Sequence, residues 1–492
     1  MLTDEQKEIV ETKSELLTVT AFAGTGKTTS LCHFANARAG KKILYLAFNK
    51  AMVIQAQGAF KLSANVEAKT IHSLAFKYEK HNLQSALGEL RMFDIKPYCL
   101  KCGVIIKTVS GLDFITRLFN EYLLSASPDP KTFISGVSLE VKAELNLYQV
   151  SLEQAALIMS KLWEDISAGV LSTPHNFYLK RFQLNKIQLG YDWIMVDEAQ
   201  DINDCAIDII LNQQSKIILV GDPYQQIYSW NGAVNAIAKV KKKGADSLYL
   251  TQSFRCPKTN EGMVNGYLEL LGSPKKFKGR ADSVEVRKSY PAFLARTNVG
   301  LFEAAVNYHK EYSIYYNGGF DRYEFDSLVD LALLKLGKKD TVKNFLIKSF
   351  TDYEELKDYT EQSVINPLKP KVTLVEKYDS RVIDLYENLK DRQAFTEFKA
   401  DIIFSTTHKA KGLEYGIVNL ANDFIDLKEK IVIAKYGNQS GPVVVSKEEF
   451  HLLYVAITRS LGNVYSSAEY TLTPDLIKIF LKMVDDGEIE YC

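Results

Sequence analysis

The stretch Leu16-Leu-Thr-Val-Thr-Ala21-Phe-Ala-Gly24-Thr-Gly26-Lys27-Thr28 decides the fold class of this 492-residue chain. An apolar, β-branched run leads into a loop with two glycines, and a helical stretch follows that ends at Gly40. This order matches the phosphate-loop pattern, except that Ala21 stands where the pattern has glycine. The stretch therefore predicts an α/β fold that binds nucleotide phosphates.

The loop residues have the chemistry that phosphate binding needs. Gly24 and Gly26 let backbone N–H groups turn inward, and the start of the following helix adds partial positive charge. Lys27 would neutralise β and γ oxygens, and Thr28 would hold Mg²⁺ through its hydroxyl. A purely structural glycine turn is disfavoured because strand, loop, Lys, Thr and helix are in register. The residues expected to bind ATP here are Ala23, Gly24, Thr25, Gly26, Lys27, Thr28 and Thr29.

Two acids follow another apolar run, Ile194 to Val196. At the carboxyl end of a strand, Asp197 can reach the metal ion and Glu198 can polarise an attacking water. The same acids could instead cap a helix and add negative charge to its first turn. The phosphate loop upstream favours the catalytic interpretation.

Composition places the chain among ordinary folded proteins, with 46% hydrophobic and 24% charged residues. Its length predicts about two to four domains. Lys plus Arg and Asp plus Glu are balanced at 60 each, so a nucleic-acid footprint must be local. Lys239 to Lys243 and Lys275 to Arg280 are candidates, although a short basic run is more often a solvated face.

Export and metal-binding signals are weak. No apolar run reaches the roughly 18 residues that span a bilayer, and the N-terminus lacks an export signal, so we expect a cytoplasmic protein without a membrane partner. Cys99 and Cys102 have CxxC spacing, which is half of a zinc site. Because no second pair completes it, we expect a packed or surface loop there.

Strand candidates occur in two groups, which predicts two separate sheets in an α/β fold. Charged, helical stretches separate the strands and are expected to be insertions, from about Lys77 to Lys180 and from about Phe320 to Ala400. The first group is Leu16 to Thr20, Ile43 to Ala47, Ile194 to Val196 and Ile217 to Val220; the second is Phe293 to Ala295, Ile402 to Ser405 and Ile417 to Leu420.

A further motif combines acid, amide and aromatic residues: Gly221-Asp222-Pro-Tyr-Gln225-Gln-Ile-Tyr228-Ser-Trp230-Asn231. Aromatic faces stack on any base, with about 1 to 3 kcal/mol per contact. Tyr228 and Trp230 could instead be core residues, but the surrounding Gly, Pro and Asn indicate a loop.

Together these stretches resemble the superfamily 1A helicases, the UvrD, Rep and PcrA group, across both predicted cores. Members of that group also carry Ala at the first loop position. Four motifs are closer in sequence to the helicase core of the F-box DNA helicases: Phe48-Asn49-Lys50, Thr70-Ile-His72, Thr251 to Arg255 and Thr407 to Gly412. The resemblance starts almost at Gln6, so we expect no F-box and do not transfer a ubiquitin-ligase role.

The resemblance implies nucleotide roles for five further residues. Gln6 would read adenine, Gln225 would sense the γ-phosphate, and Glu414 would bind the ribose. Arg255 and Arg459 would reach the γ-phosphate, following arginine-finger logic. Taken alone, each arginine would more often form a surface ion pair. The catalytic set is thus Lys27, Asp197, Glu198, Gln225, Arg255 and Arg459, with Thr28 and Asp197 as Mg²⁺ ligands.

DNA contacts are implied at seven positions. For the two histidines a structural role is the alternative. The family usually has Arg where this chain has Asn231, which removes one cationic link between DNA and nucleotide. The expected DNA-binding residues are Phe48, Asn49, His72, Tyr228, Trp230, Thr407 and His408.

The resemblance implies two RecA-like P-loop NTPase cores that face each other across an ATP cleft, each with a mainly helical insertion. The expected bounds are 1–76 and 181–258 for the first core, 77–180 for its insertion, 259–319 and 398–492 for the second core, and 320–397 for a reduced second insertion.

The expected activity is ATP- and Mg²⁺-dependent movement on single-stranded DNA, by resemblance 3′ to 5′, with unwinding at duplex junctions in repair, recombination or replication. Alternatives remain open: a translocase that strips recombinase or other proteins from DNA, the motor of a nuclease or defence complex, or a binding module that ATP only switches.

Overall fold

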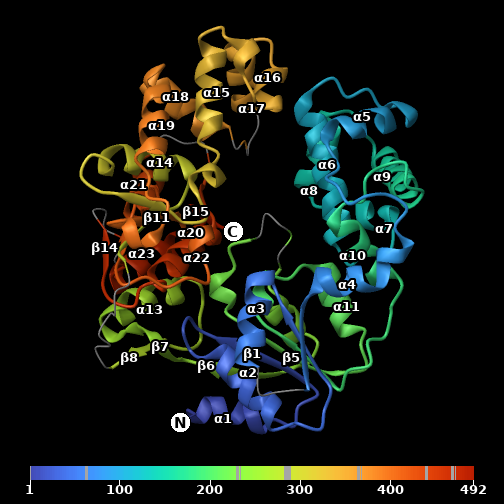
Figure 1. Cartoon of the computed structure of the whole chain (residues 1–492), viewed down its shortest axis with the longest axis vertical. Coiled ribbons are helices and arrows are strands. Elements are labelled where there is room, and N and C mark those ends of the chain that lie inside the picture. Colours follow the sequence, from blue (N-terminus) through green and yellow to red (C-terminus); the bar gives the residue numbers. More distant parts are fainter. Residues whose placement is uncertain are drawn as a thin grey trace. The chain divides into compact units, whose positions relative to one another are not determined.

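The computed structural model describes residues 2–492 except 61–64, 229–231, 233, 282–289, 363–365, 367, 438–440, 467–469 and 471. The chain forms two compact units (Figure 1). The first comprises Met1–Ala21 and Gly26–Leu250, and the second comprises Phe22–Thr25 and Thr251–Cys492. The chain thus passes into the second unit and back again within the glycine loop.

The first unit is built on a six-stranded parallel sheet with strand order β3-β2-β4-β5-β1-β6. All strands being parallel, their carboxyl ends meet at one edge, where loops gather functional side chains. The strands are β1 (Leu16–Ala21), β2 (Ile43–Ala47), β3 (Val66–Thr70), β4 (Trp193–Val196), β5 (Lys216–Gly221) and β6 (Asp246–Leu250).

Both faces of this sheet are covered, because alternate strand residues enter two different apolar cores. Ile43 and Tyr45 of β2 belong to one core, whereas Leu44 and Leu46 belong to the other. The first core is closed by α1 (Asp4–Glu11), α2 (Lys27–Asn36) and α3 (Lys50–Ala59); the second is closed by α4 (Ile71–Glu79), α10 (His175–Leu184), α11 (Asp204–Leu211) and α12 (Ala236–Lys241).

Between α4 and α10 the chain forms a helical subdomain with its own apolar core. Helix α6 alone buries nine residues, so it supplies much of this core. Its helices are α5 (Met92–Lys101), α6 (Val109–Leu124), α7 (Pro130–Ser135), α8 (Leu139–Leu147) and α9 (Leu152–Ser167).

The second unit contains a five-stranded parallel sheet with order β10-β11-β9-β12-β14 and two small two-stranded sheets, β7-β8 and β13-β15. The large sheet comprises β9 (Ala292–Ala295), β10 (Ile314–Tyr316), β11 (Ile402–Thr406), β12 (Val418–Leu420) and β14 (Val464–Ser466). The small sheets comprise β7 (Gln252–Pro257), β8 (Lys278–Arg280), β13 (Val443–Val445) and β15 (Ile489–Tyr491). Its helices outside the segment between β10 and β11 are α13 (Glu261–Leu270), α14 (Asn298–Tyr308), α20 (Thr407–Ala410), α21 (Leu427–Tyr436), α22 (Lys447–Ile457) and α23 (Pro474–Asp485).

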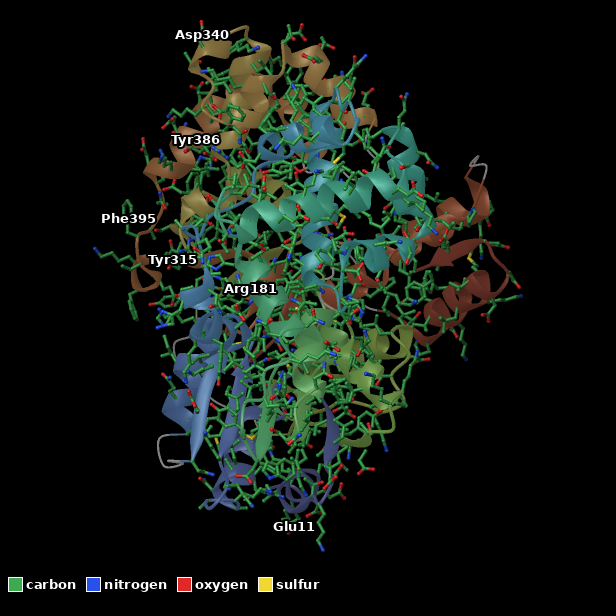
Figure 2. The ribbon with its side chains drawn as sticks, turned by 90° about the vertical axis from the view of Figure 1, so that its right-hand side faces the viewer. Glu11, Arg181, Tyr315, Asp340, Tyr386 and Phe395 are labelled. Atoms are coloured by element: carbon green, nitrogen blue, oxygen red, sulfur yellow. The ribbon has the colours of Figure 1, made fainter. Side chains whose placement is uncertain are left out.

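Helices also fill the segment between β10 and β11. They are α15 (Asp326–Lys335), α16 (Phe345–Ser349), α17 (Tyr353–Gln362), α18 (Lys369–Tyr378) and α19 (Arg381–Asp391). After α19 the chain returns toward β11 past Phe395, whose side chain is 83% exposed and points away from the ribbon (Figure 2).

The α/β class with two parallel sheets is confirmed, and all seven expected strands are present in the expected two groups. In the two large sheets, the sequence did not predict β3, β6, β10 and β14, which are the outermost strands. The strands of the two small sheets, β7, β8, β13 and β15, were not predicted either. In β3 every residue is only half-buried, so it lacks the apolar run typical of a central strand. The four-part division into cores and insertions stays a proposal.

The structure also bears on membrane-spanning helices and on the Cys99–Cys102 pair. Within the described ranges, no helix is long and apolar enough to cross a membrane. Cys99 is buried and Cys102 is half-buried at the end of α5, and both are free thiols.

Ile194 at the centre of the first sheet offers a test of the packing. It is fully buried, so Ile194→Ala should lower the free energy of unfolding by about 2–5 kcal/mol. Ile105 is 71% exposed, so Ile105→Ala should change it by less than about 0.5 kcal/mol. Urea unfolding followed by circular dichroism measures both, and equal effects would contradict this placement of β4.

Candidate nucleotide and nucleic-acid site

The glycine loop between β1 and α2 depends on two left-handed backbone positions. Gly24 has φ +71° and Gly26 has φ +79°, a region that favours glycine. A Cβ at Gly24 would also lie 2.4 Å from the Cβ of Arg255. Gly26 is the N-cap of α2 and brings no capping side chain. The first N–H groups of an α-helix have no intrahelical acceptor, and those of α2 receive none from a capping side chain.

The first half of the loop packs within the second unit. Ser253 Oγ donates a hydrogen bond to the Ala23 carbonyl at 2.9 Å, and Phe254 N donates to the Gly24 carbonyl at 2.8 Å. Ala23 N donates to Tyr454 Oη at 3.4 Å. Ser253 and Tyr454 were not among the expected site residues, because each meets the loop only through the fold.

Lys27 and Glu198 form an ion pair at the carboxyl edge of the first sheet. Lys27 Nζ lies 2.7 Å from both carboxylate oxygens of Glu198. Burial alone would lower the pKa of Lys27, but Glu198 and Asp197 outweigh burial and raise it. Lys27 is therefore a cation held at the mouth of the loop.

Asp197 is 2% exposed and is held from two sides. Tyr45 Oη donates to one carboxylate oxygen at 2.6 Å, and Glu198 N donates to the other at 2.9 Å. Burial, reinforced by Glu198, raises the pKa of Asp197. Tyr45 was not an expected site residue; its only signal is a hydroxyl in an otherwise apolar strand.

Glu198 has an unusual backbone, with φ 50° and ψ 46°. A non-glycine residue in the left-handed region costs about 1–2 kcal/mol, so its surroundings must offset this cost. The Lys27 ion pair and a hydrogen bond from Gln200 Nε2 at 2.7 Å do so. Such strain, supported by several contacts, is characteristic of functional sites.

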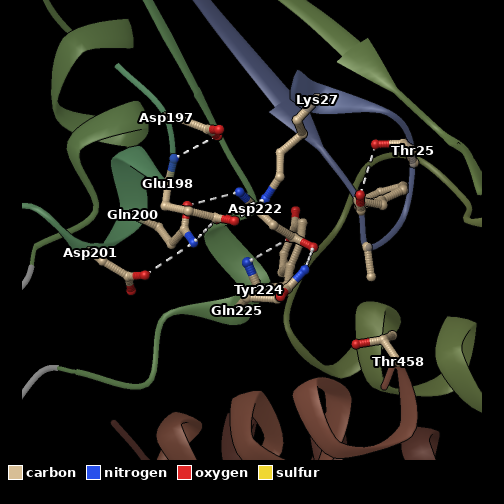
Figure 3. A network of polar contacts seen from close by, with 12 residues as sticks. Thr25, Lys27, Asp197, Glu198, Gln200, Asp201, Asp222, Tyr224, Gln225 and Thr458 are labelled. Carbon is tan, nitrogen blue, oxygen red and sulfur yellow. Dashed lines mark hydrogen bonds and ion pairs between the residues drawn. The ribbon is translucent and has the colours of Figure 1, made fainter. Parts of the chain in front are cut away.

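Gln225 lies in the turn after β5, buried with Asp222. Its Nε2 donates to the Asp222 carboxylate at 2.7 Å, which sets the orientation of its amide (Figure 3). The turn therefore presents Gln225 from the same sheet edge as Lys27 and Glu198.

The two predicted arginines lie in the second unit. Arg255 Nε donates to Glu414 at 2.7 Å, so the glutamate expected at the ribose is here the partner of an arginine. Arg459 follows α22, is almost fully buried, and its Nε donates to the Val455 carbonyl at 3.0 Å.

Phe48 and Tyr228 stack on each other, with ring centroids 5.4 Å apart and planes 14° apart. Both are half-buried and follow β2 and the β5 turn. Trp230 and Asn231 lie outside the described residues.

The remaining expected DNA contacts have structural partners. Asn49 caps α3 by accepting from Met52 N at 2.9 Å, and His72 Nε2 pairs with Asn176 at 3.0 Å. Burial lowers the pKa of His72, which favours the neutral ring. Thr407 is buried and donates to the Ala295 carbonyl at 3.4 Å, and His408 lies half-buried in α20.

Phe48 and His72 line a pocket of about 140 Å³ in the first unit. Asp197 and Asp201 form part of its wall, together with apolar residues such as Leu124 and Ile202. Expected DNA-contacting residues and the expected metal ligand thus line one space.

Three further residues that were expected to bind ATP, Gln6, Thr28 and Thr29, lie in α1 and in the first turn of α2. Gln6 is buried and completes a capping box at α1, in which its Oε1 accepts from Thr3 N at 3.0 Å. Thr28 is half-buried and Thr29 is exposed in the first turn of α2.

The chain's own groups fit Mg²⁺ and a triphosphate. The uncapped start of α2 and Lys27 supply donors and positive charge. Asp197 and Thr28 supply oxygen ligands, which Mg²⁺ prefers in small number beside phosphates. In the part of the chain that the structure describes, no cluster of three or more His, Cys, Asp or Glu forms a separate metal site.

Comparison with known proteins accounts for this arrangement. The family model for the UvrD-like helicase C-terminal domain matches residues 179–469, more than half of the chain, and a model for an AAA domain matches residues 6–231. The chain belongs to the UvrD-like helicase family. This confirms the family resemblance that the sequence motifs indicated.

Individual relatives agree with the UvrD-like assignment. F-box DNA helicase 1 of Gallus gallus is 31% identical over 93% of this chain and 48% of its own length. F-box DNA helicase protein 1 of Schizosaccharomyces pombe is 28% identical over 93% of this chain and 56% of its own length. ATP-dependent DNA helicase PcrA of Staphylococcus aureus is 26% identical over 56% of this chain and 40% of its own length. The chain spans about half the length of the F-box relatives.

Nucleotide binding should depend on Lys27. At 100 times the dissociation constant, bound Mg-ATP should stabilise the wild-type chain by about 2.7 kcal/mol, and Lys27→Ala should remove this gain. Lys41→Ala is the control, because Lys41 also pairs with an acid, Asp192 at 3.4 Å, but precedes β2 at the opposite sheet edge. Thermal unfolding with and without Mg-ATP measures the effect; an undiminished shift in Lys27→Ala would contradict the assignment.

Proposed function

We propose that this UvrD-like chain is an ATP-dependent DNA helicase that moves along single-stranded DNA. One observation carries the proposal: the nucleotide residues and the aromatic pair follow four adjacent strands of one sheet. The glycine loop follows β1, Phe48 follows β2, Asp197 and Glu198 follow β4, and Gln225 and Tyr228 follow β5. In open parallel α/β sheets, ligands bind at this edge, outside the carboxyl ends of the strands.

Hydrolysis would use groups that the first unit already holds close together. Lys27 would leave Glu198 to neutralise phosphate oxygens, and the freed carboxylate would orient the attacking water. Asp197, fixed by Tyr45, would hold Mg²⁺ with Thr28. Arg255 and Arg459 of the second unit are proposed to stabilise charge on the transferred phosphoryl group.

The grip on DNA would come from stacking. Phe48 and Tyr228 are already parallel at 5.4 Å, so a base would have to separate them and replace their contact. The relatives are named DNA helicases, which favours DNA over RNA. A 3′ to 5′ direction, junction unwinding, roles in repair, recombination or replication, and recombinase or nuclease partners are proposed on resemblance alone.

ATP hydrolysis should require Glu198 and respond to single strands. Single-stranded DNA should raise the wild-type ATPase rate, and the effect should weaken steeply as salt rises because phosphate contacts release counterions. Glu198→Gln should lower kcat by about 100-fold or more, since the base is lost, while strand binding persists. Steady-state ATPase with single-stranded DNA, RNA and duplex, repeated across salt concentrations, measures both.

An ATPase rate in Glu198→Gln equal to wild type would reject the catalytic assignment. A wild-type rate that no nucleic acid stimulates would instead favour a binding module that ATP switches. A tailed-duplex unwinding assay beside a filament-displacement assay separates a helicase from a translocase that strips proteins.

Stacking should dominate strand affinity at the aromatic pair. Phe48→Ala and Tyr228→Ala should each cost about 1–3 kcal/mol of single-strand binding, because an aromatic face is lost. Tyr436→Ala is the control, since Tyr436 is an exposed aromatic at the end of α21. Fluorescence anisotropy with a labelled oligonucleotide measures the affinity. Wild-type affinity in both Phe48→Ala and Tyr228→Ala would exclude the stacking role.

A further inference from the structure

Gln200 lies between the two polar loops that follow β4 and β5. It belongs to a short 3₁₀ turn, Ala199–Asp201, and its side chain is completely buried. Family resemblance assigned no role to this residue. A buried amide must find hydrogen-bond partners, and those of Gln200 lie in both loops.

The amide of Gln200 joins Glu198 to Asp222. Its Nε2 donates to the Glu198 carboxylate at 2.7 Å and, more weakly, to Asp201 at 3.4 Å. Its Oε1 accepts from the backbone N–H of Asp222 at 3.0 Å. The approach is close: a Cβ at Gly221 would lie 2.3 Å from Oε1. Figure 3 shows the side chain spanning the two loops.

Asp222 extends this connection to the turn that precedes Tyr228. Its carboxylate accepts from Tyr224 N at 3.1 Å and from Gln225 Nε2 at 2.7 Å. Three residues after Gln225 comes Tyr228, which stacks on Phe48. A continuous series of hydrogen bonds and one ion pair therefore runs from Lys27 through Glu198, Gln200 and Asp222 to the turn that carries Tyr228, all within the first unit.

Only a primary amide of this length suits the position. One end must donate to a carboxylate and the other must accept from an N–H group. Glutamate could accept from Asp222 N but would repel Glu198, and methionine would fill the space without either bond. The chemistry thus requires glutamine for bonding as well as for packing.

We propose that Gln200 is a positioning residue that couples the state of Glu198 to the Asp222–Gln225 turn and so to the aromatic pair. In this structure Glu198 is shared between Lys27 and Gln200. When Lys27 turns to a phosphate, Gln200 remains the partner of Glu198 and transmits its movement to Asp222. The inference rests on the proposed function, since it describes how that site is regulated.

The test compares Gln200→Met with Gln183→Met. Gln183 is a matched control: it is buried in α10 of the same unit and its Nε2 donates to Asp208 at 2.8 Å, away from the nucleotide site. For each variant we would measure the stimulation of ATPase by single-stranded DNA, the KM for ATP, and oligonucleotide affinity with and without ADP.

Coupling between two sites usually changes an affinity by about 5- to 150-fold, so Gln200→Met should reduce the stimulation ratio by a factor of about that order. It should also abolish the change in oligonucleotide affinity caused by ADP, while affinity without nucleotide stays close to wild type. Gln183→Met should keep both couplings. A Gln200→Met variant with wild-type stimulation and wild-type response to ADP would overturn the proposal.

A loss of thermal stability alone would not imitate this pattern, because basal and stimulated rates would then fall together, and that outcome also overturns the proposal. If Gln200→Met does not fold, Gln200→Glu keeps the shape and one bond, and the same loss of coupling is expected. The wild-type chain separates the two hypotheses: without stimulation by single-stranded DNA the proposed function fails, whereas stimulation that survives in the Gln200 variants rejects only the coupling role.

Discussion

The need to compensate buried charge at one edge of the first sheet determines much of the site. Lys27, Asp197 and Glu198 approach one another where water is scarce, so each requires a partner of opposite charge or a hydrogen-bond donor. The left-handed backbone of Glu198 and the hydroxyl of Tyr45 meet this requirement. Because the ion pair joins residues 171 positions apart, it depends on β1 and β4 lying in the same sheet.

The central part of the fold could be predicted from the sequence. Strands such as β2 and β4 are buried on both faces, so their sequences are continuous apolar runs. The outer strands could not, because a strand with one neighbour keeps polar residues such as those of β3. Local composition reports how deeply a strand is buried, and only the completed sheet shows which strands pair.

The site could be predicted where its functional residues are neighbours in the sequence. Gly26 and Lys27 stand in one loop, and Asp197 and Glu198 end one strand, so both groups were visible without a structure. Gln200 and Tyr45 were not, although Gln200 is only two residues from Glu198. Their roles depend on Asp222 and Asp197, which approach them only in the folded chain. The sequence alone does not indicate which group a buried amide or phenol will bond to.

The division of the glycine loop has a consequence for modularity. Phe22–Thr25 belongs to the second unit, although strand β1 before it and helix α2 after it belong to the first. Phe22 is fully buried and packs against Phe277, with ring centroids 6.3 Å apart. A fragment that ends at Leu250 would expose this aromatic ring and leave the Ala23 carbonyl without Ser253. A boundary drawn at Leu250 therefore separates half of the phosphate loop from the residues that hold it in place.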